Sequence, residues 1–382
     1  MSLKIARRGT VPPFIVMDVM NAAAARLAQG KDVLHLEVGQ PSTPAPARVI
    51  AAARDFLGRD LLGYTAALGT PALRQAIADY TNRRYGIAID PGRIAVAPGS
   101  SAVFMLAFLT AFEAGDRVAV PVPGYPAYRH ILKALGVETI SMRMTAGTHF
   151  QPTVAALEKI DGPLDGLIIS SPSNPTGSMI AAEQLRAVAE YCENRGIRLI
   201  SDEIYHGITY GEPAQTASTY SDQAIVINSF SKYFSMTGWR LGWMVLPEDM
   251  VRAVECLSQN MFISAPTLSQ HAAVAAFDCE DDLEVNVTRY ARNRELLLNE
   301  LPRAGFTDLA PADGAFYIYA DISSMDGDAE NMCRAMLDET GVAATPGLDF
   351  DPELGNRYIR FSFAGSTGDM AEAARRLIAW RK

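Results

Sequence analysis

The amino-acid sequence predicts an α/β protein whose central β-sheet is mostly parallel and is covered by helices on both faces. Short apolar runs typical of buried strands alternate with helical segments between Ile94 and Ile227. This alternation indicates parallel pairing, because a crossover between parallel strands is usually a helix. Polar residues follow the strands, at the edge where sheets of this kind bind ligands. A length of 382 residues is enough for two domains.

Composition and charge exclude several classes of protein. Hydrophobic residues make up 49% and charged residues 20% of the chain, as is ordinary for a soluble enzyme. A net charge of -9 argues against a nucleic-acid-binding surface. The apolar tracts are too short to cross a bilayer, and the first residues lack the apolar core of a secretory signal. We therefore expect no nucleic-acid or membrane partner.

Cysteine and histidine usage indicates a reducing compartment and no metal site. The four cysteines are widely spaced and include no C-x-x-C pair, so we expect free thiols. The five histidines show no spacing typical of metal ligands. The free thiols, together with the net charge of -9, predict a cytoplasmic protein.

The N-terminal part contains two predicted helices and a tight turn. Residues 18–29 are alanine-rich, as is typical of a helix. Residues 33–36 alternate like a strand and lead to Gly39, which permits a tight turn. Thr70 suits the N-cap of the second helix and Pro71 its first position, and we expect this helix to end at Gly86.

A strand, a glycine-containing turn and a helix follow one another in residues 94–97, 98–101 and 102–112. Such a turn directs backbone N–H groups and the positive end of a helix dipole at one point, which favours an anion near Ser100 and Ser101. The turn does not match the glycine patterns of nicotinamide-binding or P-loop proteins. A dehydrogenase is therefore not supported.

The next two strands end in residues suited to a flat, polar ligand. Residues 117–121 lead to Tyr125, whose ring suits stacking on a heterocycle. Residues 167–170 lead to a turn around Asn174, in the segment Asn-Pro-Thr-Gly.

A carboxylate ends the following strand, residues 197–200. Asp202 needs a cationic partner if it is buried, and a pyridinium N–H is one such partner. Glu203 points to the opposite face if the strand alternation continues, so we leave it out of the site. Tyr205 lies just beyond.

A single lysine after the strand at residues 225–227 is the strongest candidate for catalysis. Burial disfavours the charged amine of Lys232 and lowers its pKa, as a Schiff-base nucleophile requires near neutral pH. Ser229, Ser231 and Arg240 flank this lysine and suit a doubly charged phosphate ester.

The C-terminal part is predicted to form a smaller unit. A long amphipathic helix at residues 282–301 leads to strands at 314–319 and 358–363. Arg360 lies on the opposite face of the last strand from its apolar neighbours. Its planar guanidinium suits bidentate binding of a carboxylate.

These motifs resemble, in type and order, the fold-type I pyridoxal-phosphate (PLP) aminotransferases of class I/II, the aspartate aminotransferase superfamily. The resemblance extends from Gly39 to Arg360 and includes S-x-P-x-N-P-T-G, D-E-x-Y and S-x-S-K-x-x-x-x-x-G-W-R-x-G. It implies a large PLP-binding domain, residues 45–284, with a mostly parallel seven-stranded sheet between helices. A smaller α/β domain would contain residues 1–44 and 285–382.

The resemblance also implies a role for each candidate residue. Lys232 would hold PLP as an internal aldimine and then act as the catalytic acid and base. Asp202 would keep the pyridine nitrogen protonated, Tyr205 and Asn174 would bind the phenolic oxygen, and Tyr125 would lie on the ring face.

The remaining implied roles concern the phosphate and the substrate carboxylate. The residues expected at the phosphate are Ser100, Ser101, Ser229, Ser231, Arg240 and, from the neighbouring subunit, Tyr64. The residues expected at the substrate are Gly39, Asn174 and Arg360. A homodimer with composite active sites follows from the position of Tyr64.

The implied function is transfer of the amino group of an L-amino acid, through pyridoxamine phosphate, to a 2-oxo acid in amino-acid biosynthesis. A PLP-dependent β-lyase acting on cystathionine or a cysteine conjugate would keep the same residues. A non-catalytic PLP-binding regulator would need an N-terminal DNA-binding domain, for which we expect no room before Gly39.

The donor stays open between aspartate, aromatic, alanine and methionine types. A dicarboxylate donor would need a second arginine, and the sequence does not separate the candidates Arg7, Arg8, Arg129 and Arg143.

Overall fold

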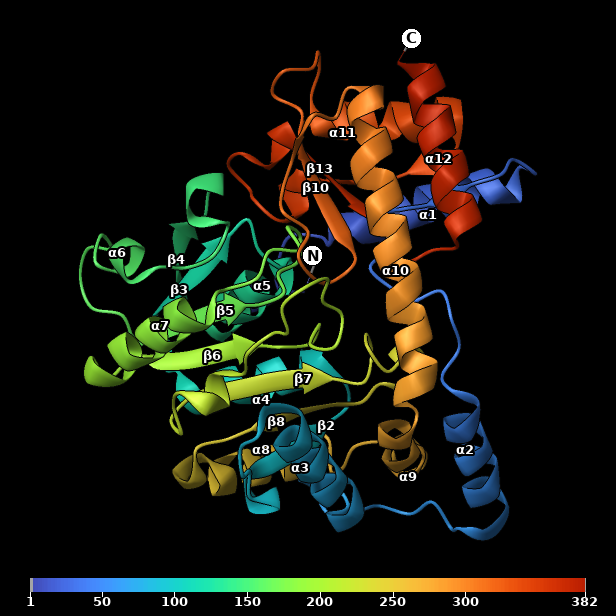
Figure 1. The fold of residues 1–382 in the computed structure, drawn as a ribbon. Helices are drawn as coiled ribbons and strands as arrows, with labels where there is room; N and C mark the ends of the chain where they lie inside the picture. Colours follow the sequence, from blue (N-terminus) through green and yellow to red (C-terminus); the bar gives the residue numbers. More distant parts are fainter. Residues whose placement is uncertain (1–2, 382) are drawn as a thin grey trace.

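A seven-stranded β-sheet forms the centre of the larger part of the computed structural model, which describes residues 3–381 (Figure 1). Its spatial order is β2-β8-β7-β6-β5-β3-β4. Strand β8 is antiparallel to both of its neighbours, whereas the remaining pairs are parallel. The predicted mostly parallel sheet is therefore confirmed. The strands are β2 (Ile94–Ala97), β3 (Arg117–Val122), β4 (Glu138–Arg143), β5 (Gly166–Ser170), β6 (Arg198–Asp202), β7 (Ile225–Ser229) and β8 (Gly242–Val245).

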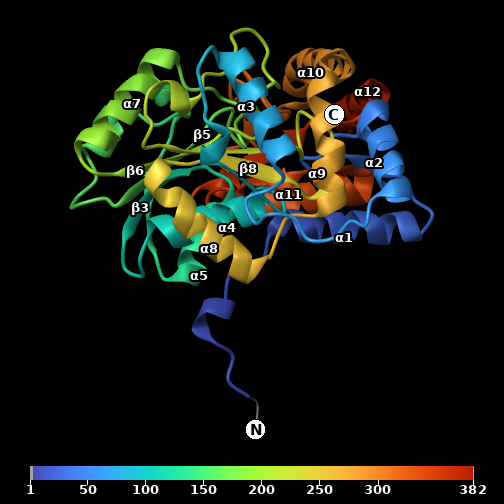
Figure 2. The ribbon, with the colours of Figure 1, turned by 90° about the horizontal axis from the view of Figure 1, so that it is seen from below.

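Helices cover both faces of this sheet, as Figure 2 shows from below. Alternate residues of one strand face opposite helical layers: Leu167 and Ile169 pack in one hydrophobic core, and Ile168 packs in the other. Strands that are buried on both faces need apolar residues at nearly every position, which explains why the strands of this sheet are short apolar runs in the sequence. The first layer contains α3 (Pro71–Tyr85) and α7 (Ala182–Asn194), and the second contains α4 (Ser100–Ala111), α5 (Pro126–Leu135) and α8 (Val251–Met261).

The smaller part combines segments from both ends of the chain. An antiparallel sheet has the order β12-β13-β10-β9, and β1 pairs in parallel with β11, with Leu34 opposite Val342. The elements are α1 (Ile15–Ala28), β1 (Leu34–His35), β9 (Asp308–Leu309), β10 (Tyr317–Asp321), α11 (Ala329–Ala335), β11 (Val342–Ala343), β12 (Thr345–Pro346), β13 (Tyr358–Ser362) and α12 (Thr367–Trp380).

The long helix α10 (Glu280–Glu300) runs along both parts (Figure 1). The predicted domain boundary between residues 284 and 285 falls inside this helix, and the division of the chain at that point stays a prediction. The remaining helices α2 (Ala47–Arg59), α6 (Val154–Leu157) and α9 (Thr267–Val274) belong to the larger part. Among the described residues, we find no helix with the length and apolar character needed to cross a membrane.

Several predicted helix ends are confirmed, and two helices begin earlier than predicted. The Thr70 side chain accepts a hydrogen bond from the Leu73 N–H (3.4 Å), and α3 ends at Gly86, whose φ of 68° is left-handed. Helix α4 begins at Ser100 rather than at residue 102, because Gly99 is its N-cap. Helix α1 begins at Ile15 instead of residue 18.

Candidate active site

A cavity of about 210 Å³ lies beyond the carboxyl ends of the central strands, where the larger and smaller parts meet. The structure brings eleven of the predicted site residues together in its lining: Gly39, Ser100, Ser101, Tyr125, Asn174, Asp202, Tyr205, Ser231, Lys232, Arg240 and Arg360. Within the described chain, Ser229 and Tyr64 lie outside this lining. The cavity therefore gathers residues from segments that are distant in the sequence.

Lys232 extends into this cavity from the loop after β7. Its Nζ donates a hydrogen bond to the Gly39 carbonyl (2.6 Å) and lies 5.8 Å from the centre of the Tyr205 ring. Burial and the nearby Arg360 guanidinium lower the pKa of Lys232 to about 8. An appreciable fraction of the amine is therefore neutral near pH 7, and the neutral amine is the nucleophile.

Hydroxyl groups fix the loop that carries Lys232. The Ser229 Oγ accepts from the Ser231 N–H (3.1 Å) and donates to the Leu241 carbonyl (3.3 Å). The Thr237 Oγ1 donates to the Ser231 carbonyl (2.9 Å). The structure thus gives Ser229 backbone partners beneath the loop, and its predicted contact with a phosphate stays a prediction.

A positively charged cradle forms where α4 begins. Ser100 and Ser101 occupy the first turn of α4, whose free N–H groups favour an anion. The Arg240 guanidinium packs directly on Gly99: a Cβ atom there would lie 2.3 Å from Arg240 Nη2. Glycine is therefore required for the guanidinium to approach the helix N-terminus. The Arg240 Nη1 is held by the Thr237 carbonyl (3.0 Å).

Asp202 places a buried carboxylate at the end of β6. It accepts hydrogen bonds from the Tyr128 hydroxyl and from the Ile204 N–H (3.1 Å). Burial raises the pKa of Asp202 to about 6, although both hydrogen bonds act in the opposite direction. A cation bound beside this carboxylate would favour its ionised form. Tyr128 was not predicted, and its only signal in the sequence is its spacing of three residues from Tyr125, at the start of α5.

Four tyrosines shape the cavity wall, namely Tyr125, Tyr128, Tyr205 and Tyr317. Burial raises the pKa of Tyr125 to about 12, so this phenol is neutral at physiological pH, and its ring packs edge-to-face against Tyr128. The hydroxyl oxygens of Tyr205 and Tyr317 are 2.6 Å apart. Tyr317 also explains Gly39, because a Cβ atom on Gly39 would lie 1.8 Å from the Tyr317 Oη. No sequence pattern indicated the role of Tyr317, which lies on β10.

Arg360 is buried at the cavity, with 3% of its surface exposed. Its Nη1 donates to Asn174 Oδ1 (2.9 Å), and its Nη2 donates to the Glu37 carbonyl. The rings of Tyr317 and Phe350 lie 4.5 and 4.7 Å from its Cζ. Its Nε has no hydrogen-bond partner among residues 3–381. A buried arginine with donor capacity to spare suits a carboxylate ligand.

The other side of the cavity is apolar and comes from the start of α1. The side chains that line it there are Phe14, Val16, Met17 and Met20. The Asp349 carboxylate fixes this end of the helix, because it accepts hydrogen bonds from the N–H groups of Ile15 (3.0 Å) and Val16 (3.2 Å). No pattern in the sequence predicted this wall.

The four arginines considered for a second carboxylate are engaged or placed elsewhere. Arg129 donates to the carbonyls of Asp349 and Phe350, and Arg143 pairs with Asp351 (2.6 Å). The other two lie in the exposed turn η1 (Arg7–Gly9). In the part of the chain that the structure describes, none of the four lines the cavity.

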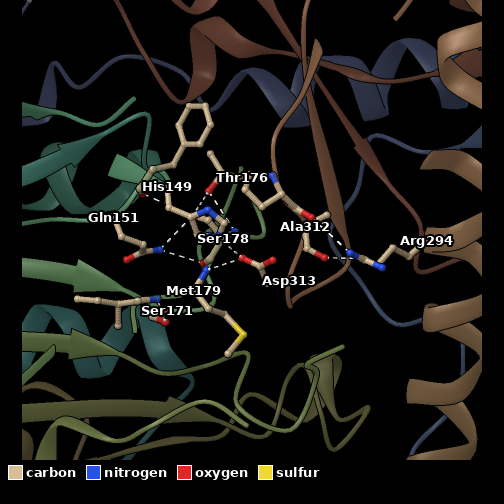
Figure 3. A network of polar contacts seen from close by, with 12 residues as sticks. His149, Gln151, Ser171, Thr176, Ser178, Met179, Arg294, Ala312 and Asp313 are labelled. Carbon is tan, nitrogen blue, oxygen red and sulfur yellow. Dashed lines mark hydrogen bonds and ion pairs between the residues drawn. The ribbon is translucent and has the colours of Figure 1, made fainter. Parts of the chain in front are cut away.

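A polar network holds the turn that carries Asn174 (Figure 3). The Asp313 carboxylate accepts from His149 Nε2 (2.6 Å) and from the Met179 N–H (3.3 Å), whereas Gln151 Nε2 donates to the Ser178 carbonyl (2.9 Å). Arg294, from α10, holds the neighbouring Ala312 carbonyl at 2.6 Å. The turn is thus fixed to the segment that leads into β10.

Comparisons with known proteins agree with this geometry. The family model described as aminotransferase class I and II matches residues 31–377. The valine–pyruvate aminotransferase of Mycobacterium tuberculosis is 50% identical over 384 residues, which cover 100% of this chain and 99% of that protein.

Solved structures give the same result. The crystal structure of an aminotransferase from Mycobacterium tuberculosis has 49% identity and a TM-score of 0.97, with 99% of each chain covered. The aspartate aminotransferase from Thermus thermophilus, solved with maleate, has 27% identity and a TM-score of 0.93, with 99% of this chain and 100% of that chain covered.

Proposed function

The chain belongs to the class I and II aminotransferases, and we propose that its cavity binds PLP and performs both half-reactions of amino-group transfer with Lys232 as the catalytic residue. One observation carries this proposal. The lysine whose pKa is lowered shares a single cavity with the Asp202 carboxylate, the Arg240 cradle and the Arg360 guanidinium.

The charges around the cavity fit PLP. The buried Asp202 carboxylate suits a protonated pyridine nitrogen. The first turn of α4, with Arg240 packed on Gly99, suits a phosphate group. Tyr125 offers a neutral aromatic surface between these two places. When bound, PLP supplies an electron sink that makes the Cα proton of an amino acid acidic.

The protein's own residues then bind the substrate and move its protons. Arg360 and the backbone at Gly39 hold the α-carboxylate of the amino acid, with Asn174 beside them. The neutral Nζ of Lys232 accepts the Cα proton and later returns a proton, as a general base and acid. With PLP bound, Asp202 would stay ionised beside the pyridine nitrogen, and Tyr205 would donate a hydrogen bond to the ring oxygen.

We propose apolar L-amino acids as donors, with valine and pyruvate as the first pair to test. The similar protein from Mycobacterium tuberculosis has the name valine–pyruvate aminotransferase. The wall formed by Phe14, Val16, Met17 and Met20 supports an apolar side chain. A dicarboxylate donor is not favoured, since Arg129 and Arg143 already have partners outside the cavity.

The function is tested by the absorption spectrum of the purified, PLP-loaded protein. We expect valine to abolish the visible band of the lysine-bound cofactor and pyruvate to restore it, with alanine as a product. Lys232→Ala should lose this cycle. Pyruvate and ammonia released from a cysteine conjugate without any added oxo acid would instead indicate β-elimination, which none of the similar proteins described above supports.

We also propose that the enzyme is a cytoplasmic homodimer in amino-acid biosynthesis, with Tyr64 reaching the phosphate site of the neighbouring subunit. Tyr64 and Leu61 are 83% and 96% exposed. The segment of Leu61 and Tyr64 lies beside another exposed apolar residue, Ile263. The Thr65 N–H donates a hydrogen bond to the Oγ of Ser264, the neighbour of Ile263 in the chain (3.4 Å). Clustered exposed apolar side chains are typical of an interface.

Mixing two inactive variants tests the composite site. Lys232→Ala and Tyr64→Ala homodimers would be dissociated together and reassembled at limiting PLP. A hybrid dimer contains one intact site, so activity should exceed that of either parent. Activity no greater than that of the parents, with hybrids detected by mass spectrometry, would contradict a site shared between subunits.

A further inference from the structure

We infer that Glu37 and His35 form a positioning pair for Arg360, and that the charge on His35 tunes how tightly the site binds a carboxylate. This inference rests on the proposed role of Arg360 at the substrate carboxylate. Neither Glu37 nor His35 lines the cavity among the residues described, so they act through Arg360 rather than on the substrate.

The backbone of Glu37 orients the Arg360 guanidinium. The Glu37 carbonyl accepts from Arg360 Nη2 and also from Thr345 Oγ1 (2.9 Å). The rings of Tyr317 and Phe350 on either side limit the plane of the guanidinium. Its rotation within that plane is set by the Glu37 carbonyl, by Asn174 Oδ1 (2.9 Å) and by Thr345 Oγ1 (3.3 Å), which itself donates to the Glu37 carbonyl. A shift of Glu37 therefore rotates the carboxylate-binding fork.

The side chain of Glu37 is a buried charge with one close partner. It is 1% exposed, and its Oε1 lies 2.8 Å from His35 Nδ1, whereas its Oε2 has no hydrogen-bond partner in the described part of the chain. The His35 side chain is 47% exposed and can exchange its proton with solvent. A buried carboxylate is costly unless it is paired, so the position of this segment depends on His35.

The surrounding charges favour protonated His35. Glu37 raises the pKa of His35 more than burial lowers it, and Asp369 at the start of α12 acts in the same direction as Glu37. The remaining charged residues of α12 near β1 are paired: Glu372 with Arg375 and Arg376, and Arg376 with Asp32. The facing strand β11 contributes Val342 and Ala343.

The same segment supports two basic side chains of the site, Arg360 and Lys232. Glu37 holds Arg360, and Gly39, two residues further on, accepts the hydrogen bond of Lys232. Because the pKa of His35 is raised in the folded protein, the stabilising pair is fully present at acidic pH. It is lost as the pH rises through that raised pKa. Carboxylate binding should therefore weaken toward alkaline pH.

The experiment measures binding of 3-methylbutanoate, a carboxylate without an amino group, to the PLP-loaded enzyme by calorimetry between pH 6 and pH 9. In the wild type, the dissociation constant should rise by about three- to fivefold with pH, the size expected for a partly exposed ion pair. Glu37→Gln keeps the shape but not the charge, so this rise should disappear. His35→Gln should bind weakly across the whole range.

The control is His130→Gln on α5, which should retain the wild-type pH dependence. The kcat for valine should change less than twofold in His35→Gln and Glu37→Gln, while KM changes, because binding rather than chemistry is affected. If the dissociation constant of Glu37→Gln for 3-methylbutanoate rose with pH as it does in the wild type, the inference would be overturned. If Glu37→Gln did not fold, an unchanged profile in His35→Gln would overturn it equally. Absence of transamination in the wild type would count against the proposed function, whereas the calorimetry tests the positioning pair separately.

Discussion

Tyr128 shows how one residue outside the predicted set controls a charge inside it. Its hydroxyl donates to Asp202 and lowers the pKa of a carboxylate that burial raises to about 6. In the proposed mechanism, Asp202 must be ionised to keep the pyridine nitrogen of PLP protonated. We therefore expect the balance between burial and this hydrogen bond to set the acid limit of activity.

Tyr128→Phe should move that limit to higher pH. Without the hydroxyl donor, the pKa of Asp202 rises further, and the acid side of the kcat/KM profile for valine should shift upward by about one pH unit. The matched control is Tyr210→Phe, which removes a hydroxyl bonded to the Ala315 carbonyl (2.6 Å). An acid limb that coincides with the wild type would show that Tyr128 does not tune Asp202.

Glu203, the neighbour of Asp202, illustrates a buried acid without a catalytic role. Its Oε1 accepts from Ser201 Oγ (2.9 Å) and the Ala217 N–H (2.8 Å), on the side away from the cavity, as strand alternation predicted. Burial raises its pKa to about 7. In the unfolded chain the pKa is lower, so the folded protein binds the proton more tightly.

The consequence is a loss of stability with rising pH. The free energy of unfolding should fall as the pH increases from the unfolded pKa to about 7, and then level off. Glu203→Gln keeps the acceptor oxygen and removes this titration. It should therefore raise the free energy of unfolding at pH 8 by about 1–3 kcal/mol and have a smaller effect at pH 5. Urea midpoints at both pH values test this, with the exposed Glu158→Gln as control; equal shifts at pH 5 and pH 8 would contradict it.

At the scale of elements, the sequence predicted those helix ends that are capped by residues close by in the chain. Thr70 and Gly86 delimit α3 as expected, since capping depends on neighbouring residues. The start of α1 was not predictable in this way. Its first N–H groups are satisfied by Asp349, more than 300 residues away in the chain. A cap supplied by the fold leaves no pattern near the helix.

Asp349 therefore connects helix formation to substrate recognition. Asp349→Ala should release the first turn of α1, which carries Phe14 and Met17 into the cavity. The loss of a cap costs about 1 kcal/mol of stability. We expect the KM for valine to rise about five- to tenfold, with a smaller change in kcat, because the altered contacts serve binding.

Ser366→Ala is the matched control for that variant. Ser366 caps α12 by accepting the Asp369 N–H (3.0 Å), and it does not line the cavity. A similar loss of stability is expected, without a change in KM. If both variants changed KM equally, the effect of Asp349→Ala would come from general destabilisation of the protein and not from a change in the apolar wall of the cavity.

At the scale of the whole molecule, the site is assembled from both parts of the chain. Asp202 ends β6 and Lys232 follows β7, so their position could be predicted because parallel strands end at one edge of the sheet. Arg240 lies just before β8, which begins at the same edge because it is antiparallel to β7. Tyr317 and the apolar wall could not be predicted, since they reach the cavity only through tertiary packing. Arg360 was predicted from its motif, yet its burial depends on Glu37, Asn174 and two aromatic rings.

This assembly predicts two separable effects of ligands on stability. PLP should act mainly on the larger part, through Arg240 and Asp202, whereas a substrate carboxylate should bind to Arg360 in the smaller part. A ligand stabilises by an amount set by its concentration relative to its dissociation constant, about 2.7 kcal/mol at a hundredfold excess. In the wild type, PLP and then 3-methylbutanoate should each raise the melting temperature.

Two variants separate the contributions. Arg360→Leu should keep the rise in melting temperature caused by PLP and lose the rise caused by 3-methylbutanoate, because only the carboxylate fork is removed. Arg240→Leu should lose much of the rise with PLP, since the phosphate cradle loses its guanidinium. Arg143→Leu, which breaks a pair with Asp351 outside the cavity, should retain both rises and controls for the loss of a charge. If 3-methylbutanoate still raised the melting temperature of Arg360→Leu, the substrate carboxylate would bind elsewhere. The position of the buried Arg360 guanidinium would then need another explanation.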